Sequence, residues 1–116
     1  MIERLTTDHS RVAAQVRSGD LPLEHMRQSS NDRDVLLKAL GKSEDENASP
    51  DIIIQSIRSG DVLVLCSDGL WSILSQERIA HVVREYPPQQ TCEELVRLAD
   101  EIGGDENISV VLLSFS

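Results

Sequence analysis

Near the start of the chain, apolar residues recur at the spacing of an amphipathic helix. Thr7 or Asp8 can cap a helix over about residues 9–18, and Gly19 is suited to end it. A second short helix is expected over residues 21–29.

Two further helices are expected in the second half of the chain. Ser75 can cap a helix over about 76–86, and two prolines directly after this stretch stop it. Thr91 is expected to start the next helix, because Glu94 three residues later completes a capping box. Gly103 then ends that helix. Its apolar inner face consists of Leu95, Leu98, Ala99 and Ile102.

Short β-branched and apolar runs predict strands. Residues 51–57 and 62–66 are separated by the turn sequence 58–61, so they are expected to form a β-hairpin. The run 62–66, VLVLC, is apolar at every position, which predicts that both of its faces are covered. A last buried strand is expected over 108–115, whereas 34–40 fits either strand or helix.

The expected order is helices, strands, helices and a final strand, which fits a sheet layer with helices packed on it. This order predicts an α/β (α+β) fold. With 116 residues, the chain is expected to form a single domain over 1–116. Residues 41–50, GKSEDENASP, are small, polar and acidic, and are expected to form an acidic surface loop within that domain.

Charge and composition narrow the class of partner. A formal net charge of −9 argues against nucleic acid and against an anionic membrane surface as partners. It is compatible with divalent cations, which bind carboxylate oxygens. The sequence contains no apolar run long enough to span a membrane and no pattern of signal-peptide type, so a cytoplasmic protein is the default expectation. Cys66 and Cys92 form no metal-binding or disulfide pattern.

Two acidic turns stand at predicted strand ends. The SDG turn, Ser67-Asp68-Gly69, follows the run VLVLC, and the DEN turn, Asp105-Glu106-Asn107, precedes the last strand. If these two strands are neighbours, both acidic groups converge at one edge of the sheet, where carboxylates can bind Mg²⁺ or Mn²⁺. The competing interpretation is ordinary turn chemistry, because Asp-Gly is a common turn dipeptide.

Four segments of the chain resemble motifs of the metal-dependent serine/threonine phosphatases of type 2C (PPM), and they occur in the family's order. They span nearly the whole chain. The segments are 5–10 (LTTDHS), 35–41 (VLLKALG), 66–71 (CSDGLW) and 103–111 (GGDENISVV).

This resemblance implies an α/β/β/α sandwich with a pair of metal ions, Mn²⁺ or Mg²⁺, in a cleft at one end of two sheets. It also implies hydrolysis of phosphoserine or phosphothreonine in a phosphoprotein by a metal-activated water. Asp68 matches a metal-ligand aspartate of the family, and Glu106 stands where the family has another. Because glutamate reaches one methylene further, Asp105 is an alternative ligand if the loop slips by one residue.

The resemblance also implies what the chain lacks. The family's first half carries RxxNED-like and DGxGG-like segments, which supply a phosphate-binding arginine and an aspartate that bridges both metals. Neither segment occurs in this sequence. We therefore expect a partial sandwich without its N-terminal half: a fragment, a split gene product or a chain with a mis-assigned start.

Three functional hypotheses follow. The chain is the C-terminal portion of a phosphatase, inactive alone, whose missing half comes from further sequence or from a second chain. Alternatively, it is a degenerate phosphatase-like binding module or a non-functional remnant. The resemblance implies sheets that mix strands from both halves, so loss of one half should leave unpaired edges and bare apolar faces. The isolated chain is therefore expected to associate, to be partly unfolded or to depend on a partner.

Overall fold

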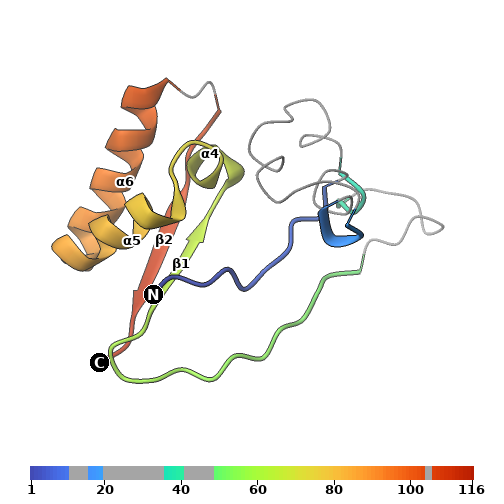
Figure 1. Cartoon of the computed structure of the whole chain (residues 1–116), viewed down its shortest axis with the longest axis horizontal. Helices are drawn as coiled ribbons and strands as arrows, with labels where there is room; N and C mark the ends of the chain where they lie inside the picture. The colour runs from blue at the N-terminus through green and yellow to red at the C-terminus, as the bar shows by residue number, and fades with distance from the viewer. Residues whose placement is uncertain (11–15, 20–35, 41–48, 104–105) are drawn as a thin grey trace. The chain divides into compact units, whose positions relative to one another are not determined.

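The structure is a computed structural model that describes residues 1–10, 16–19, 36–40, 49–103 and 106–116 (Figure 1). The chain divides into two compact units, one of residues 1–3 with 55–116 and the other of residues 4–54. The helix expected over 21–29 and most of the acidic loop expected over 41–50 lie outside the described residues.

Of the helix expected over 9–18, residues 9–10 and 16–18 are described. Ser10 forms an isolated β-bridge with Leu36, so the helix does not begin at residue 9 as expected. Val16 and Arg17 are helical, and the Gly19 amide donates a 3.1 Å hydrogen bond to the Val16 carbonyl. Gly19 has a positive φ of 88°, the left-handed backbone that glycine adopts without strain at the end of a helix.

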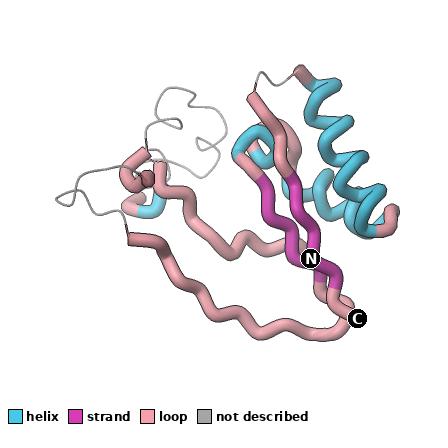
Figure 2. Tube along the Cα trace, turned by 180° about the vertical axis from the view of Figure 1, so that it is seen from behind, coloured by secondary structure: helices cyan, strands magenta, loops and turns pink. Residues whose placement is uncertain are grey.

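The first unit contains a two-stranded antiparallel sheet. Strands β1 (Val62–Cys66) and β2 (Val110–Ser114) run side by side in Figure 2. In their register Val62 lies opposite Ser114, and Cys66 lies opposite Val110. The strand predicted over 62–66 is thus confirmed, and the strand predicted over 108–115 forms but is shorter.

The predicted hairpin between 51–57 and 62–66 is wrong. Residues 51–57 form no strand, and they are exposed. The turn at 58–61 does form, but its hydrogen bonds lead to the end of β2: the Gly60 amide donates to the Phe115 carbonyl at 2.7 Å. A partner that lies about 50 residues away in the sequence thus takes the place of the adjacent run.

Three helices follow β1 in the chain: α4 (Asp68–Trp71), α5 (Gln76–Glu85) and α6 (Pro88–Ile102). The Ser75 hydroxyl accepts a 3.2 Å hydrogen bond from the Arg78 amide, which confirms the predicted N-cap of α5. Gly103 has a positive φ of 99° and ends α6, as predicted. The single turn of α4 was not predicted.

The predicted capping box at Thr91 is wrong, because α6 begins at Pro88 and Thr91 lies inside it. Proline suits the first position of a helix, where its missing amide hydrogen has no partner to lose. Thr91 is 1% exposed, and its hydroxyl donates a 2.9 Å hydrogen bond to the Tyr86 carbonyl. The threonine therefore ties the start of α6 to the end of α5.

The core of this unit lies on one side of the sheet, under the helices. Leu95 and Ala99 of α6 are fully buried, as predicted, but Ile102 at the end of the expected inner face is 55% exposed. Cys66 and Val110, opposite one another in the sheet, pack against this core. The buried hydrophobic residues are Leu70, Leu74, Ile79, Val82, Leu95 and Ala99.

Within the first unit, no described element covers the other face of the sheet. Leu65 and Val111 are opposite one another in the register, and they are 49% and 58% exposed. Leu113, on the same face by the alternation of strand side chains, is also exposed. The prediction that both faces of VLVLC are covered is therefore wrong for this chain, because among its described residues helices pack on one face only.

Thr91→Val is expected to destabilise the first unit by about 1–2 kcal/mol, because valine keeps the shape but leaves the Tyr86 carbonyl without its donor. Urea denaturation followed by circular dichroism measures the change. Thr6→Val, at an exposed threonine, is the control and should have little effect. Equal effects of the two substitutions would rule out a stabilising role for the Thr91 hydrogen bond.

Candidate metal centre

The SDG turn lies directly at the end of β1. Ser67 has an extended backbone and precedes α4, whose first residue is Asp68. Asp68 is half-buried, and Gly69 and Leu70 after it are buried. The leucine enters the core and thereby fixes the short helix that begins at Asp68.

The DEN turn precedes β2. Glu106 is half-buried and Asn107 is exposed, while Asp105 lies outside the described residues. Because β1 and β2 are antiparallel, the end of β1 pairs with the start of β2. The topology therefore brings the SDG turn and the described part of the DEN turn to the same end of the sheet, as the sequence predicts for neighbouring strands.

Ser67 makes three hydrogen bonds across to the other strand end, one to the DEN turn itself and two to Ser109 just after it. Its amide donates to the Ser109 carbonyl at 3.0 Å, which continues the ladder of the sheet by one step. Its hydroxyl accepts from the Ser109 amide at 3.0 Å and donates to the Asn107 carbonyl at 3.3 Å. Sequence reasoning assigned no role to this serine; its position directly after a strand and before an acidic turn is the signal that marks it.

Gly69 allows the two turns to touch. A β-carbon at this position would lie 2.5 Å from the Asn107 carbonyl oxygen and 3.4 Å from Cβ of Glu106. The first distance is far below an ordinary van der Waals contact, so only glycine permits this approach. The backbones of the SDG and DEN turns are therefore packed directly against one another.

The donor chemistry at this edge fits part of a site for a hard divalent cation. Asp68 and Glu106 supply carboxylate oxygens from the two touching turns, and Oε2 of Glu106 is buried from solvent. Among the described residues, no group of three or more histidine, cysteine, aspartate or glutamate side chains is arranged to hold a metal. Two carboxylates leave most of the coordination sphere of Mg²⁺ or Mn²⁺ to other ligands.

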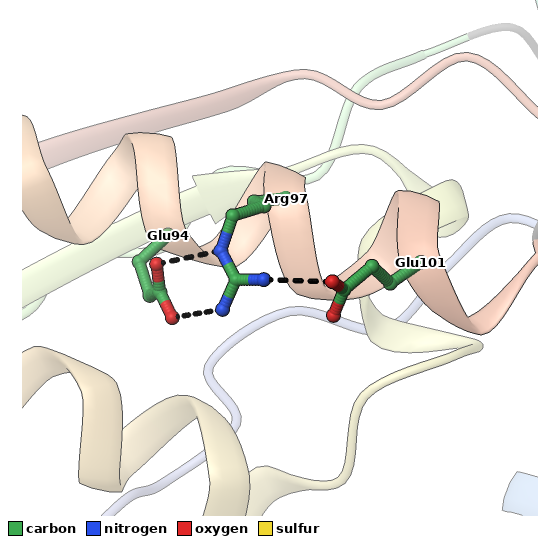
Figure 3. Close-up of polar contacts among 3 residues, drawn as sticks. All are labelled: Glu94, Arg97 and Glu101. Atoms are coloured by element: carbon green, nitrogen blue, oxygen red, sulfur yellow. Dashed lines mark hydrogen bonds and ion pairs between the residues drawn. The ribbon is translucent and has the colours of Figure 1, made fainter.

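A further charge cluster of the first unit lies on α6. Arg97 bonds to Glu94 through two nitrogens and to Glu101 at 2.9 Å (Figure 3). The hydrogen bond from Arg97 lowers the pKa of Glu94, and Glu94 in turn raises the pKa of Arg97. These residues lie three and four positions apart on one helix, so the cluster gives this exposed helix surface only weak, salt-dependent support.

Comparison with known proteins identifies the family to which this chain belongs. The family model for Protein phosphatase 2C matches residues 19–108. The chain therefore belongs to the protein phosphatase 2C family.

Individual relatives agree. Protein phosphatase PhpP of Streptococcus pneumoniae is 32% identical over 114 residues, which are 97% of this chain and 45% of the relative. A serine/threonine phosphatase structure from S. agalactiae matches 97% of this chain with a TM-score of 0.85 and 33% identity, and 46% of that structure is covered. The catalytic domain of the phosphatase PstP, solved in complex with two manganese ions, matches 93% of this chain with a TM-score of 0.75 and 27% identity, and 43% of it is covered.

These matches confirm the family and the fold class inferred from the four motifs. The chain spans about half the length of the curated relatives it matches.

Within the described part of the chain, no helix is both long and apolar enough to cross a membrane.

Gly69→Ala is expected to push the two turns apart. Alanine normally favours a helical position over glycine by about 1 kcal/mol, but here overpacking against Asn107 should reverse the sign and cost about 1–3 kcal/mol. Amide chemical shifts of Asn107 and Ser109 should move in the variant.

Gly60→Ala is the matched control for that substitution. Gly60 has a positive φ of 90° and open space around its α-carbon, so alanine there strains the backbone without a clash. It should destabilise the protein yet leave the shifts of Asn107 and Ser109 in place. If Gly69→Ala also leaves those shifts unchanged, the turns are not in contact.

Proposed function

We propose that this chain is the C-terminal portion of a metal-dependent protein serine/threonine phosphatase, and that Asp68 and Glu106 are two of its metal ligands. The observation that supports the proposal is the close approach of Gly69 to Asn107, which packs the SDG turn against the DEN turn. Family membership supports the type of reaction, hydrolysis of phosphoserine or phosphothreonine in a phosphoprotein.

The residues of this chain have holding and positioning roles in the proposed site. Asp68 and Glu106 present carboxylates to Mn²⁺ or Mg²⁺, and Ser67 fixes the distance between the two turns through its bonds to Asn107 and Ser109. Such an ion, when bound, supplies activation of a water for attack on phosphorus. That the related PstP was solved with two manganese ions supports manganese as the first ion to test.

The chain alone is proposed to lack turnover. Two carboxylates do not complete a coordination sphere, and the sequence contains no counterpart of the family's phosphate-binding arginine segment. The remaining site residues are proposed to come from the other portion of a phosphatase domain, in the same polypeptide or in a second chain. A cytoplasmic location is part of the same proposal.

The alternative is a degenerate phosphatase-like module that acts by binding a partner. The uncovered sheet face with Leu65, Val111 and Leu113 favours it, because exposed apolar patches mark interaction surfaces. The two functions differ in what Asp68 does: a binding module does not need its carboxylate, whereas a phosphatase portion does.

Mn²⁺ titration of the chain, followed by the loss of the free-ion electron paramagnetic resonance signal, tests the two ligands. Weak binding is expected, and Asp68→Asn or Glu106→Gln should weaken it at least about tenfold. Substitution of a residue that only hydrogen-bonds to a metal ligand already lowers metal affinity about ten- to a hundredfold. Asp100→Asn, at an exposed aspartate of α6, is the control and should leave the titration unchanged.

Activity is then tested with the missing portion supplied in trans, as the N-terminal part of S. pneumoniae PhpP. Mn²⁺-dependent hydrolysis of a phosphothreonine peptide is expected from the mixture, with neither part active alone. Asp68→Asn should abolish it. A mixture that forms a complex but stays inactive, or whose activity survives Asp68→Asn, supports the binding module instead.

The uncovered sheet face is expected to make the isolated chain associate. Sedimentation velocity should show a mass that rises with concentration, and Leu65→Lys or Val111→Lys should shift it towards the monomer, because a charge on an apolar strand face opposes pairing. Val96→Lys, at an exposed position of α6, should not change the association. A monomer with a sharp, concentration-independent melt would contradict this prediction.

A further inference from the structure

Residues 52–57, IIIQSI, form an isoleucine run that is exposed although it is mostly apolar. The exposed fractions of Ile52 and Ile54 are 86% and 96%, and those of Ile53 and Ile57 are 50% and 43%. Single apolar side chains are common on protein surfaces, but here four isoleucines stand within six consecutive residues. A continuous apolar surface of this kind marks a place that another chain can cover.

The backbone of the isoleucine run is also available for pairing. Among the described residues, its amides and carbonyls make no backbone–backbone hydrogen bond. One hydrogen bond within the run involves a side chain: the Gln55 side-chain amide donates to the Ser56 carbonyl at 3.5 Å. The run can therefore bond to an added strand, as the open edge of a sheet does.

The residue types of the run favour an extended strand. Isoleucine is β-branched and enriched in strands, and the run contains neither proline nor glycine. It contains no charged residue either, and the nearest charges are Asp51 and Arg58, one at each end. Natural edge strands oppose unwanted pairing with charged side chains or proline, and the isoleucine run lacks both.

Both ends of the run are fixed by polar contacts. At its start, one carboxylate oxygen of Asp51 lies 2.8 Å from Nε2 of His9, and the other lies 3.5 Å from Nζ of Lys38. At its end, the Arg58 amide donates a 2.9 Å hydrogen bond to the Asp61 carboxylate. Pairing therefore has to order only the short stretch between these contacts, which limits its cost in conformational entropy.

Charge favours one direction of pairing between two copies of the run. The Asp51 carboxylate is shared by Lys38, so the start of the run carries little net charge. The Arg58 side chain forms no ion pair with the described residues. In a parallel pair in register, the two Arg58 side chains would lie side by side and repel one another. In an antiparallel pair they lie at opposite ends, so the antiparallel direction is favoured.

We propose that the isoleucine run pairs with the same run of a second copy of this chain, as antiparallel strands related by a two-fold axis at Gln55. In this register Gln55 lies opposite Gln55 of the second copy, and a side-chain amide both donates and accepts hydrogen bonds. Ile53 lies opposite Ile57 of the second copy, which pairs apolar side chains across the strands. The run is thus complementary to itself, as a two-fold interface requires.

The test starts from Leu65→Lys, because its lysine opposes association through the uncovered sheet face, which does not include the run. Sedimentation velocity is expected to show that a dimer remains. Adding Ile54→Lys should raise the dissociation constant of this dimer roughly tenfold or more, because each dimer then carries two lysines in its strand pair. Adding Ile102→Lys instead, at an isoleucine that is 55% exposed outside the run, is the matched control and should leave the constant unchanged.

Amide hydrogen exchange locates the contact between the copies, in Leu65→Lys and in the parent chain. Every second amide of the run should become protected as the chain concentration rises, since antiparallel strands bond through alternate residues. A monomeric Leu65→Lys chain, a dimer whose run stays unprotected, or a dimer that Ile54→Lys leaves intact would overturn the proposal. Protection that appears only when the N-terminal part of S. pneumoniae PhpP is added would also overturn it, because that part would then be the partner of the run.

Discussion

The candidate site depends on one close approach, that of the Gly69 backbone to the carbonyl of Asn107. A side chain of any size at residue 69 would separate the turns and with them Asp68 and Glu106. The antiparallel pairing of β1 with β2 brings the turns to one end of the sheet, but pairing alone sets distances only to within a residue. The missing β-carbon of Gly69 and the hydrogen bonds of Ser67 set the distance between the two turns more finely.

How much of this follows from the sequence depends on the range of each interaction. The cap of α5 at Ser75 was predictable because its partner is the amide of Arg78, three residues away. The start of α6 at Pro88 was not predictable. Thr91 and Glu94 have the residue types of a capping box, but Thr91 lies inside the helix and its hydroxyl bonds back to the Tyr86 carbonyl. A pattern states what a residue can do, and the tertiary contact decides which option it takes.

The strand pairing shows the same limit at longer range. The run 51–57 and the run 62–66 have the pattern of a hairpin, yet β1 pairs with β2 and the turn bonds to Phe115. The convergence of the SDG and DEN turns was predictable on the condition that their strands are neighbours, which the sheet fulfils. The ligand roles of Asp68 and Glu106 stay a prediction, and so does the choice between Glu106 and Asp105. The position of Ser67 directly after a strand is visible in the sequence, but its partners Asn107 and Ser109 follow only from the strand pairing.

The distance in sequence between Ser67 and Asn107 has a consequence for synthesis. The hydroxyl of Ser67 bonds to a carbonyl 40 residues further along, and α4, α5 and α6 lie between the two. Contacts between distant residues form slowly, since the loop that joins them must first close. On a ribosome, the SDG turn therefore emerges well before the segment that fixes its shape. The acidic edge can become a defined surface only once β2 is available to pair with β1, which follows the synthesis of all three helices.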